Sequence, residues 1–200
     1  MFYHASQTAG IVRLEPRVSN HGRPLVYVSN RRENVLVYLS NAVEKFCRET
    51  GFLWDGPWET WASYGFGTDG RQRIEEYYPN ALKETYGGVS GYIYRAERIG
   101  DAGMELSIPG AFASKSAVDV VGCEWIPDAY EAILQAEREG KLTVARYEQM
   151  SEASRRWSEQ TAREEYAAAK AHPEYRHFLR AKFKIEAEEG CDLEAGRAPV

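Results

Sequence analysis

The chain has 200 residues, of which 44% are hydrophobic and 28% are charged, and this composition is typical of a packed globular protein of one or two domains. Its formal net charge of −5 disfavours a general nucleic-acid binder or a membrane-surface protein, and no apolar stretch is long enough to span a bilayer. Three widely spaced cysteines predict neither a disulfide framework nor a metal site, and without an N-terminal signal peptide we expect a cytoplasmic protein.

The N-terminal quarter predicts two strands, a loop and a helix. Apolar and β-branched runs indicate the strands, and the segment between them is interrupted by glycine and proline. Asn30, with Glu33 three residues later, forms a capping pattern, after which apolar residues recur at helical spacing as far as Phe46. Gly51 supplies a helix stop. The predicted elements are strands at 1–5 and 25–29, a loop at 6–24 and a helix at 31–49.

The rest of the chain changes gradually from strands to helices. Residues 52–72 are rich in glycine and aromatic residues without a clear period, which predicts an irregular segment. Asp128 and Glu131 form a second capping pattern, and Pro173 separates two helical patterns. The predicted elements are a helix at 73–86, strands at 91–96 and 117–125, a helix at 128–139, a strand at 142–147, a polar helix at 151–171 and an amphipathic helix at 173–187.

Strands dominate the first two thirds of this order and helices the last third, so we expect an α+β fold. We predict a core over residues 1–147 with a helical extension over 148–187 packed on it. The tail at 188–200 is expected to be flexible. The two helices of the extension also form a candidate surface for a protein partner.

The candidate chemistry lies near the N-terminus. No nucleophile elbow, zinc-protease motif, P-loop or glycine-rich dinucleotide fingerprint occurs in the sequence. His4 follows aromatic strand residues and precedes two small residues, Ala5 and Ser6. Tyr27 lies in the second strand and Tyr38 eleven residues later in the next helix, and this interval can bring two phenol rings into one cleft.

These segments resemble a known family. FYHAS, then LVYVS, then a helix containing VYL is similar to the diphtheria-toxin and poly-ADP-ribose-polymerase branch of the ADP-ribosyltransferases. There the first strand ends in Tyr-His-Gly-Ser/Thr, a later strand carries a tyrosine, and the next helix carries another. Small bacterial or phage relatives continue into Leu-x-Pro-Arg, which here is Leu14, Pro16 and Arg17. The match covers about the first 40 residues and implies an ADP-ribosyltransferase-like core with a split mixed β-sheet.

The resemblance implies that NAD is the substrate and that no metal takes part. His4 would hydrogen-bond the ribose hydroxyls, Tyr27 and Tyr38 would enclose the nicotinamide ring, and Arg17 would meet the pyrophosphate. Bond cleavage through an oxocarbenium-like state requires orientation and electrostatic support rather than a metal or a thiol. The residues expected to contact NAD are His4, Ala5, Ser6, Arg17, Tyr27 and Tyr38. Two positions depart from the family: Ala5 replaces a glycine, and Val35 replaces a carboxamide-binding serine.

The third family residue is an acid at the start of a late strand. The strand predicted at 117–125 is preceded by Ser-Lys-Ser, so its opening carries no acid. Glu105, upstream, and Glu124, at the far end of the strand, are the candidate catalytic acids, and a surface role is the alternative for each. Without an acid in the cleft, chain elongation is not expected, and the protein would be a mono-transferase or a non-catalytic binder.

The leading functional hypothesis is therefore mono-ADP-ribosyl transfer from NAD to an unknown acceptor, with a protein or small molecule favoured over a nucleic acid. One alternative is a non-catalytic module whose helices over 151–187 bind a protein partner. Another is an RNA 2′-phosphotransferase-like enzyme, for which His21, Arg13 and Arg23 offer only loosely matching residues and which the acidic charge disfavours.

Overall fold

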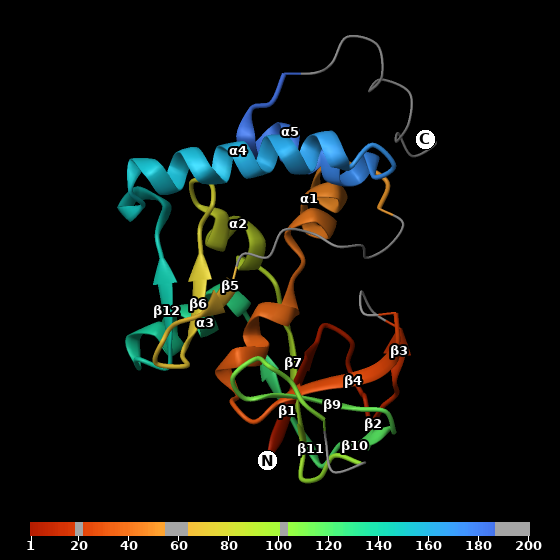
Figure 1. Cartoon of the computed structure of the whole chain (residues 1–200). Helices are drawn as coiled ribbons and strands as arrows, with labels where there is room; N and C mark the ends of the chain where they lie inside the picture. Colours follow the sequence, from red (N-terminus) through yellow and green to blue (C-terminus); the bar gives the residue numbers. More distant parts are fainter. Residues whose placement is uncertain (19–21, 55–63, 101–103, 187–200) are drawn as a thin grey trace.

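The structure is a computed structural model that describes residues 1–18, 22–54, 64–100 and 104–186 (Figure 1). It is an α+β protein, as predicted, with a large sheet at one end and helices at the other. The strands are β1 (Phe2–Ser6), β2 (Arg13–Leu14), β3 (Arg17–Val18), β4 (Pro24–Ser29), β5 (Tyr64–Phe66), β6 (Gln72–Glu75), β7 (Gly91–Ala96), β8 (Met104–Glu105), β9 (Ala111–Ser114), β10 (Val118–Asp119), β11 (Gly122–Ile126) and β12 (Leu142–Ala145). The helices are the 3-10 helices η1 (Glu33–Leu39) and η2 (Tyr147–Gln149) and the α-helices α1 (Ala42–Thr50), α2 (Ala81–Tyr86), α3 (Ala129–Arg138), α4 (Glu152–Ala168) and α5 (Pro173–Phe183).

The large sheet has the order β11-β7-β1-β4-β9-β8, with β3 paired to β4. The predicted strand at 1–5 is therefore central, as expected, and lies between the strand that carries Tyr27 and the strand at 91–96. All neighbours within this sheet are antiparallel. The parallel pairing found in the described residues joins β6 to β12 in a smaller sheet of order β12-β6-β5.

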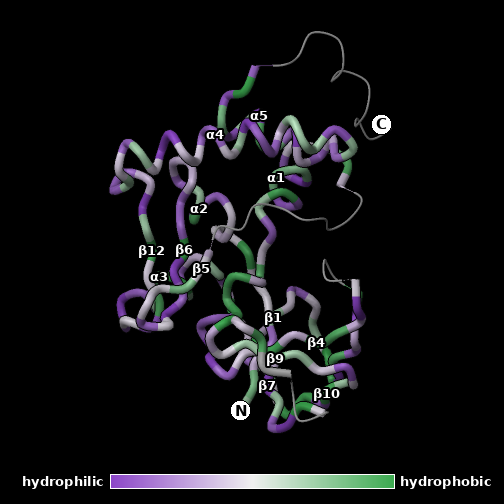
Figure 2. Tube along the Cα trace, viewed as in Figure 1, coloured by the Kyte–Doolittle hydropathy of each residue, from purple (hydrophilic) through white to green (hydrophobic). Residues whose placement is uncertain are grey.

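Alternation along the strands gives the large sheet two apolar faces. One face packs against η1 and α3, where Leu36 and Ile133 are fully buried beside Ala5. The other face packs on the small β2–β10 pair, where Val26 and Val118 are buried. Each fully buried aliphatic side chain stabilises the fold by about 1.5–3 kcal/mol. Figure 2 shows hydrophobic segments gathered around η1 and in the sheet, whereas α4 is mostly hydrophilic.

The helix predicted at 31–49 is wrong as a single element, because η1 and α1 replace it. Ser40 is extended (φ −144°, ψ 149°), and the next residue, Asn41, caps α1 by accepting hydrogen bonds from the backbone N–H groups of Val43 and Glu44. An asparagine that caps a new helix outweighs the continuous apolar spacing. The predicted stop is correct, since Gly51 ends α1 in the left-handed conformation (φ 66°).

The helix predicted at 73–86 is also wrong in its first half, where the chain forms β6 and only then α2. Tyr78 precedes Pro79, and a residue before proline is disfavoured in the α conformation. The parallel partner β12, more than sixty residues away in sequence, then fixes residues 72–75 as a strand. A long-range pairing of this kind is invisible to local periodicity.

The predicted strand at 117–125 is divided into β10 and β11, which pair with different partners, β2 and β7. β9 was not predicted from the sequence; its short AFAS segment pairs along the strand that carries Tyr27. Nor were β2, β3 and β8 predicted, each of which is only two residues long. Residues 55–63, within the segment predicted to be irregular, lie outside the described residues.

The C-terminal helices lie close to their predicted places. Asp128 caps α3 by accepting from the backbone N–H of Glu131, as the sequence pattern indicated. The apolar stripes of α4 and α5 pack on α1 and α2, and Ala162 and Leu179 are fully buried in this cluster. These stripes are therefore used within the chain. The tail predicted at 188–200 lies outside the described residues.

The two described cysteines differ in their expected reactivity. Cys47 on α1 is fully buried, and burial raises the pKa of its thiol to about 11, whereas Cys123 on β11 is exposed. With a pKa of about 11, only about one Cys47 thiol in a thousand is ionised at pH 8. The thiolate is the reactive form, so Cys47 should react slowly. We expect iodoacetamide at pH 8 to modify Cys123 and to spare Cys47 until the chain is unfolded, as measured by peptide mass spectrometry. Equal rates of modification in the native protein would contradict the packing of α1.

Candidate functional site

His4 lies where the central sheet is weakly paired. The ladder between β1 and β4 consists of the single pair Tyr3–Ser29. Next to this pair, the His4 ring connects β1 to β4, because its Nδ1 lies 2.9 Å from the Tyr27 carbonyl oxygen. A carbonyl only accepts, so Nδ1 carries the proton, and Nε2 of the neutral ring is left as a hydrogen-bond acceptor.

The electrostatics keep this ring neutral. Burial lowers the pKa of His4, the bond to the Tyr27 carbonyl partly opposes this, and the positive charge of Arg17 lowers the pKa further. Arg17 is exposed on β3, which pairs with β4. The structure thus brings together two of the predicted site residues, His4 and the backbone of Tyr27, and the charge of Arg17 acts on the His4 ring without a direct contact.

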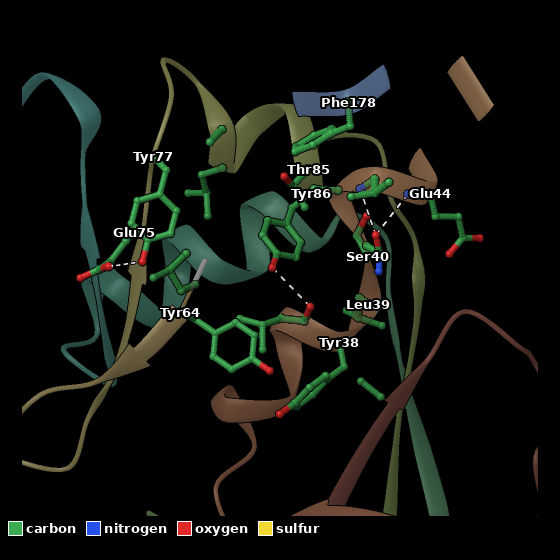
Figure 3. Close-up of a pocket in the computed structure, with 18 of the residues that line it drawn as sticks. Tyr38, Leu39, Ser40, Glu44, Tyr64, Glu75, Tyr77, Thr85, Tyr86 and Phe178 are labelled. Atoms are coloured by element: carbon green, nitrogen blue, oxygen red, sulfur yellow. Dashed lines mark hydrogen bonds between the residues drawn. The ribbon is translucent and has the colours of Figure 1, made fainter. Parts of the chain in front are cut away.

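Tyr38 belongs to a cavity of about 650 Å³ next to this region (Figure 3). The end of β1 and η1 form one side of the cavity, and α1, α2 and α5 form the other. Ala5 and Ser6, two further predicted residues, line it together with Tyr38. The Tyr38 ring is 57% exposed and meets the Tyr64 ring edge-to-face, with centroids 5.8 Å apart. An exposed aromatic ring in a cavity is a platform for a flat ligand.

The cavity wall is rich in tyrosine, and of these tyrosines only Tyr38 was predicted from the sequence as a site residue. Tyr86 donates a hydrogen bond to the Val37 carbonyl (3.3 Å), and Figure 3 shows its ring above those of Tyr38 and Tyr64. Burial raises the pKa of Tyr64 far above its usual range, and the contact with Tyr38 adds to the effect, so its hydroxyl stays protonated. The available signal was the high count of 13 tyrosines, without any spacing to group them. The tyrosines of the wall are Tyr38, Tyr64, Tyr77, Tyr78, Tyr86 and Tyr175.

His4, Tyr27 and Tyr38, the side chains expected to contact the ribose and nicotinamide, do not line one cavity. Side chains alternate along β1, so His4 and Ala5 face opposite sides of the sheet. By the Tyr3–Ser29 register, Tyr27 faces the same side as Ala5, which is the side of η1 and Tyr38. Neither His4 nor Tyr27 is among the residues that line the 650 Å³ cavity around Tyr38, which we call the tyrosine cavity. A ligand that touches His4 and Tyr38 together must therefore lie across the weakly paired junction of β1 and β4.

The two candidate acids lie away from this junction. Glu124 is on β11, two strands from β1, which corresponds to about 10 Å across the sheet. Glu105 is on the outermost strand, β8, three strands or about 14 Å from β1. The late strand beside Tyr27 is β9, which opens on Gly110 and Ala111 without an acid. In this arrangement the structure brings neither acid next to His4.

Glu124 has a partner of its own. Arg32 donates two hydrogen bonds to its carboxylate, from Nε at 2.8 Å and from Nη2 at 2.6 Å. These bonds, only partly offset by burial, lower the pKa of Glu124. The carboxylate is therefore ionised at neutral pH and is occupied by a bidentate guanidinium.

This pair gives a pH-dependent prediction. Because the native pKa of Glu124 is depressed, its stabilisation is complete above pH 4.5 and is lost as pH falls through the native value. Both side chains are partly exposed, at 34% and 46%, so we expect Glu124→Gln to lower the free energy of unfolding by less than about 1 kcal/mol at pH 7. Urea denaturation at pH 7 and pH 3 would measure the difference, which should shrink at pH 3. A larger cost at pH 3 would contradict the depressed pKa.

In comparisons with known proteins, no family model, no curated protein and no solved structure matches the chain. Within the described residues, no helix is long and apolar enough to cross a membrane. The same residues contain no group of three or more His, Cys, Asp or Glu side chains arranged to hold a metal ion.

Proposed function

We propose that the chain binds NAD across the β1–β4 junction and transfers its ADP-ribose to a nucleophilic acceptor. The observation that carries this proposal is the hydrogen bond from His4 to the Tyr27 carbonyl. It fixes the ring so that Nε2 can accept a hydrogen bond from a ribose hydroxyl. The sequence resemblance of the first 40 residues points to the same histidine.

Two further features support NAD as the ligand. Tyr38 presents an exposed ring, with Tyr64 edge-on to it, to which the flat nicotinamide can stack. Arg17 lies close enough to His4 to lower its pKa, so a positive charge is available near the ribose for the pyrophosphate. With Ala5 and Ser6 beside Tyr38, the nicotinamide would lie in the cavity, and its ribose would reach toward His4.

The transfer itself requires little covalent chemistry from the protein. The bond between C1′ of the ribose and the nicotinamide nitrogen breaks, and its electron pair leaves with nicotinamide. The acceptor forms a new bond to C1′ and releases its proton to solvent. His4 and Arg17 would orient the ribose and the pyrophosphate for this step. Because neither Glu105 nor Glu124 lies beside His4, we propose a single transfer rather than chain elongation.

A second candidate is NAD binding without transfer, and the pairing of Glu124 with Arg32 favours it. A carboxylate held by a guanidinium has fewer acceptor sites left for a ribose hydroxyl. The protein would then be a nucleotide-binding module, for which the outer surface of α4 and α5 is a candidate partner site.

Two measurements on the full chain separate these functions. Isothermal titration calorimetry with NAD tests binding, and chromatographic detection of released nicotinamide tests cleavage. Binding with release supports the transferase, and binding without release supports the module. The absence of NAD binding, with the protein folded by circular dichroism, would refute both.

A further inference from the structure

A second cavity, of about 610 Å³, is lined by residues at the carboxyl ends of β6 and β12 and at the start of α4. Figure 1 shows that both strands run toward the first turn of α4. The cavity volume is within the range of small-ligand sites, about 300–1,000 Å³. The carboxyl ends of neighbouring parallel strands and the N-terminus of a helix are both places where proteins bind phosphorylated ligands. The side chains that matter for such a ligand are Arg73, Tyr77, Arg146, Ser151 and Trp157.

Two arginines give this cavity its anion-binding capacity. Nη2 of Arg146 contacts Glu137 at 2.6 Å, whereas its Nη1 is buried and has no hydrogen-bond partner among the described residues. A buried N–H group without an acceptor is costly, and a ligand oxygen within hydrogen-bond distance of Nη1 would satisfy it. Arg73 is about half exposed and uses one nitrogen on Glu75, so donors of its planar fork remain for a phosphate.

The carboxylate that lines the cavity is already compensated. Oε1 of Glu75 contacts Nη2 of Arg73 at 2.6 Å, and Oε2 accepts a hydrogen bond of 2.5 Å from the Tyr77 hydroxyl. Both oxygens are therefore engaged, which weakens the repulsion between this carboxylate and an anion placed beside Arg146.

The start of α4 adds further polar groups. Ser151 caps this 17-residue helix, and its hydroxyl oxygen lies 2.8 Å from that of Ser154. Ser151, Ala153 and Ser154 line the cavity, so the positive end of the helix dipole lies beside it. The acid of the first turn, Glu152, is exposed and is held by Arg156.

An aromatic wall completes the site. Trp157 is 54% exposed at the cavity edge and meets the Tyr77 ring in an edge-to-face arrangement, with centroids 6.1 Å apart. Exposed indole rings beside cationic side chains are suited to the base of a nucleotide, which stacks on the aromatic face. We propose that this second cavity binds a mononucleotide, with its base on Trp157 and its phosphate between Arg73 and Arg146.

This site is distinct from the proposed NAD site. Glu75 and Tyr77 line both cavities, whereas Arg73, Arg146 and Trp157 line only the second, and Tyr38, Ala5 and Ser6 line only the first. The inference therefore stands whether or not the chain consumes NAD.

Calorimetry on the full chain with AMP, adenosine and inorganic phosphate tests the proposal. We expect AMP to bind at least about tenfold more tightly than adenosine or phosphate, because it uses both the ring and the arginines. Arg146→Gln should weaken AMP at least about tenfold and leave adenosine unchanged, whereas Trp157→Ala should weaken both. Arg163→Gln, on an exposed part of α4, is the matched control and should change nothing.

Two more variants keep the test decisive. Arg73→Gln alters a half-exposed side chain, so it reports on phosphate binding even if Arg146→Gln lowers the melting temperature. Tyr38→Ala should leave AMP affinity intact. Loss of AMP binding in Tyr38→Ala would place the nucleotide in the tyrosine cavity and overturn the proposal. Phosphate binding as tight as that of AMP, unchanged AMP binding in both arginine variants, or no AMP binding at all would overturn it too.

Discussion

His4→Ala is expected to reduce NAD-dependent activity about ten- to a hundredfold. The substitution removes the Nε2 acceptor proposed for a ribose hydroxyl, and the loss of one partly buried hydrogen bond costs about 1–3 kcal/mol. Nicotinamide release under saturating and limiting NAD measures kcat and kcat/KM. The same substitution also removes the Nδ1 donor to the Tyr27 carbonyl, so part of the effect is structural.

A pair of conservative variants separates the two ring nitrogens. In His4→Asn, the side-chain amide can donate to the Tyr27 carbonyl in place of Nδ1, but nothing replaces Nε2. We expect His4→Asn to regain stability relative to His4→Ala without regaining activity. Recovery of full activity in His4→Asn would show that the histidine acts only through the β1–β4 junction, and the ribose contact would have to be abandoned.

The two candidate acids, Glu105 and Glu124, can be compared with His4 in the same nicotinamide-release assay. Glu105→Gln and Glu124→Gln should each reduce activity less than His4→Ala, because neither lies beside the histidine in the sheet. A greater loss in either Gln variant would make that residue the catalytic acid. The pH profile gives a further check: burial holds the pKa of His4 below 6.5, so activity should be constant at pH 7–8 and fall only below pH 6.5 as Nε2 is protonated.

Local patterns predicted the elements that depend on neighbours in sequence. The cap at Asp128, the stop at Gly51 and the strand at 1–5 all rest on contacts of a few residues or on strand composition, and all are found in the structure. The position of Ser40, which breaks the predicted helix, depends on Asn41 and on the burial of η1 between the sheet and α3. Periodicity indicates which face of a helix is buried. It cannot show that nearly every side chain of η1 is buried.

The candidate site was predicted only in part for the same reason. His4, Tyr38 and the small residues after His4 lie within one motif, and the sequence could single them out. The cavity around Tyr38 is closed by Tyr64, Tyr86 and Phe178, which come from distant parts of the chain. Whether Glu124 reaches the junction depends on the order of strands and on Arg32, and neither is encoded in a local pattern.

Leu179→Ala is expected to cause the largest loss of stability, about 2–5 kcal/mol at 25 °C. Leu179 is fully buried on α5 in the cluster that joins the helical extension to α1 and α2. Truncation removes apolar contacts and leaves a cavity that surrounding helices fill only in part. Leu53→Ala is the matched control, because Leu53 is 61% exposed and its truncation should change stability by no more than about 0.5 kcal/mol.

The form of the unfolding transition tests whether the extension and the core fold together. Apolar packing between α5 and α1 is continuous, so we expect one cooperative transition in urea, shifted as a whole by Leu179→Ala. A separate early transition that alone responds to the substitution would show that residues 148–187 fold independently. Tyr175 and Phe178 of α5 also line the tyrosine cavity, so the packing of α5 should affect the proposed NAD site. We therefore expect Leu179→Ala to weaken NAD binding at urea concentrations below the unfolding transition, whereas Leu53→Ala should not. Unchanged NAD affinity in a folded Leu179→Ala protein would show that the packing of α5 does not hold the proposed NAD site in shape.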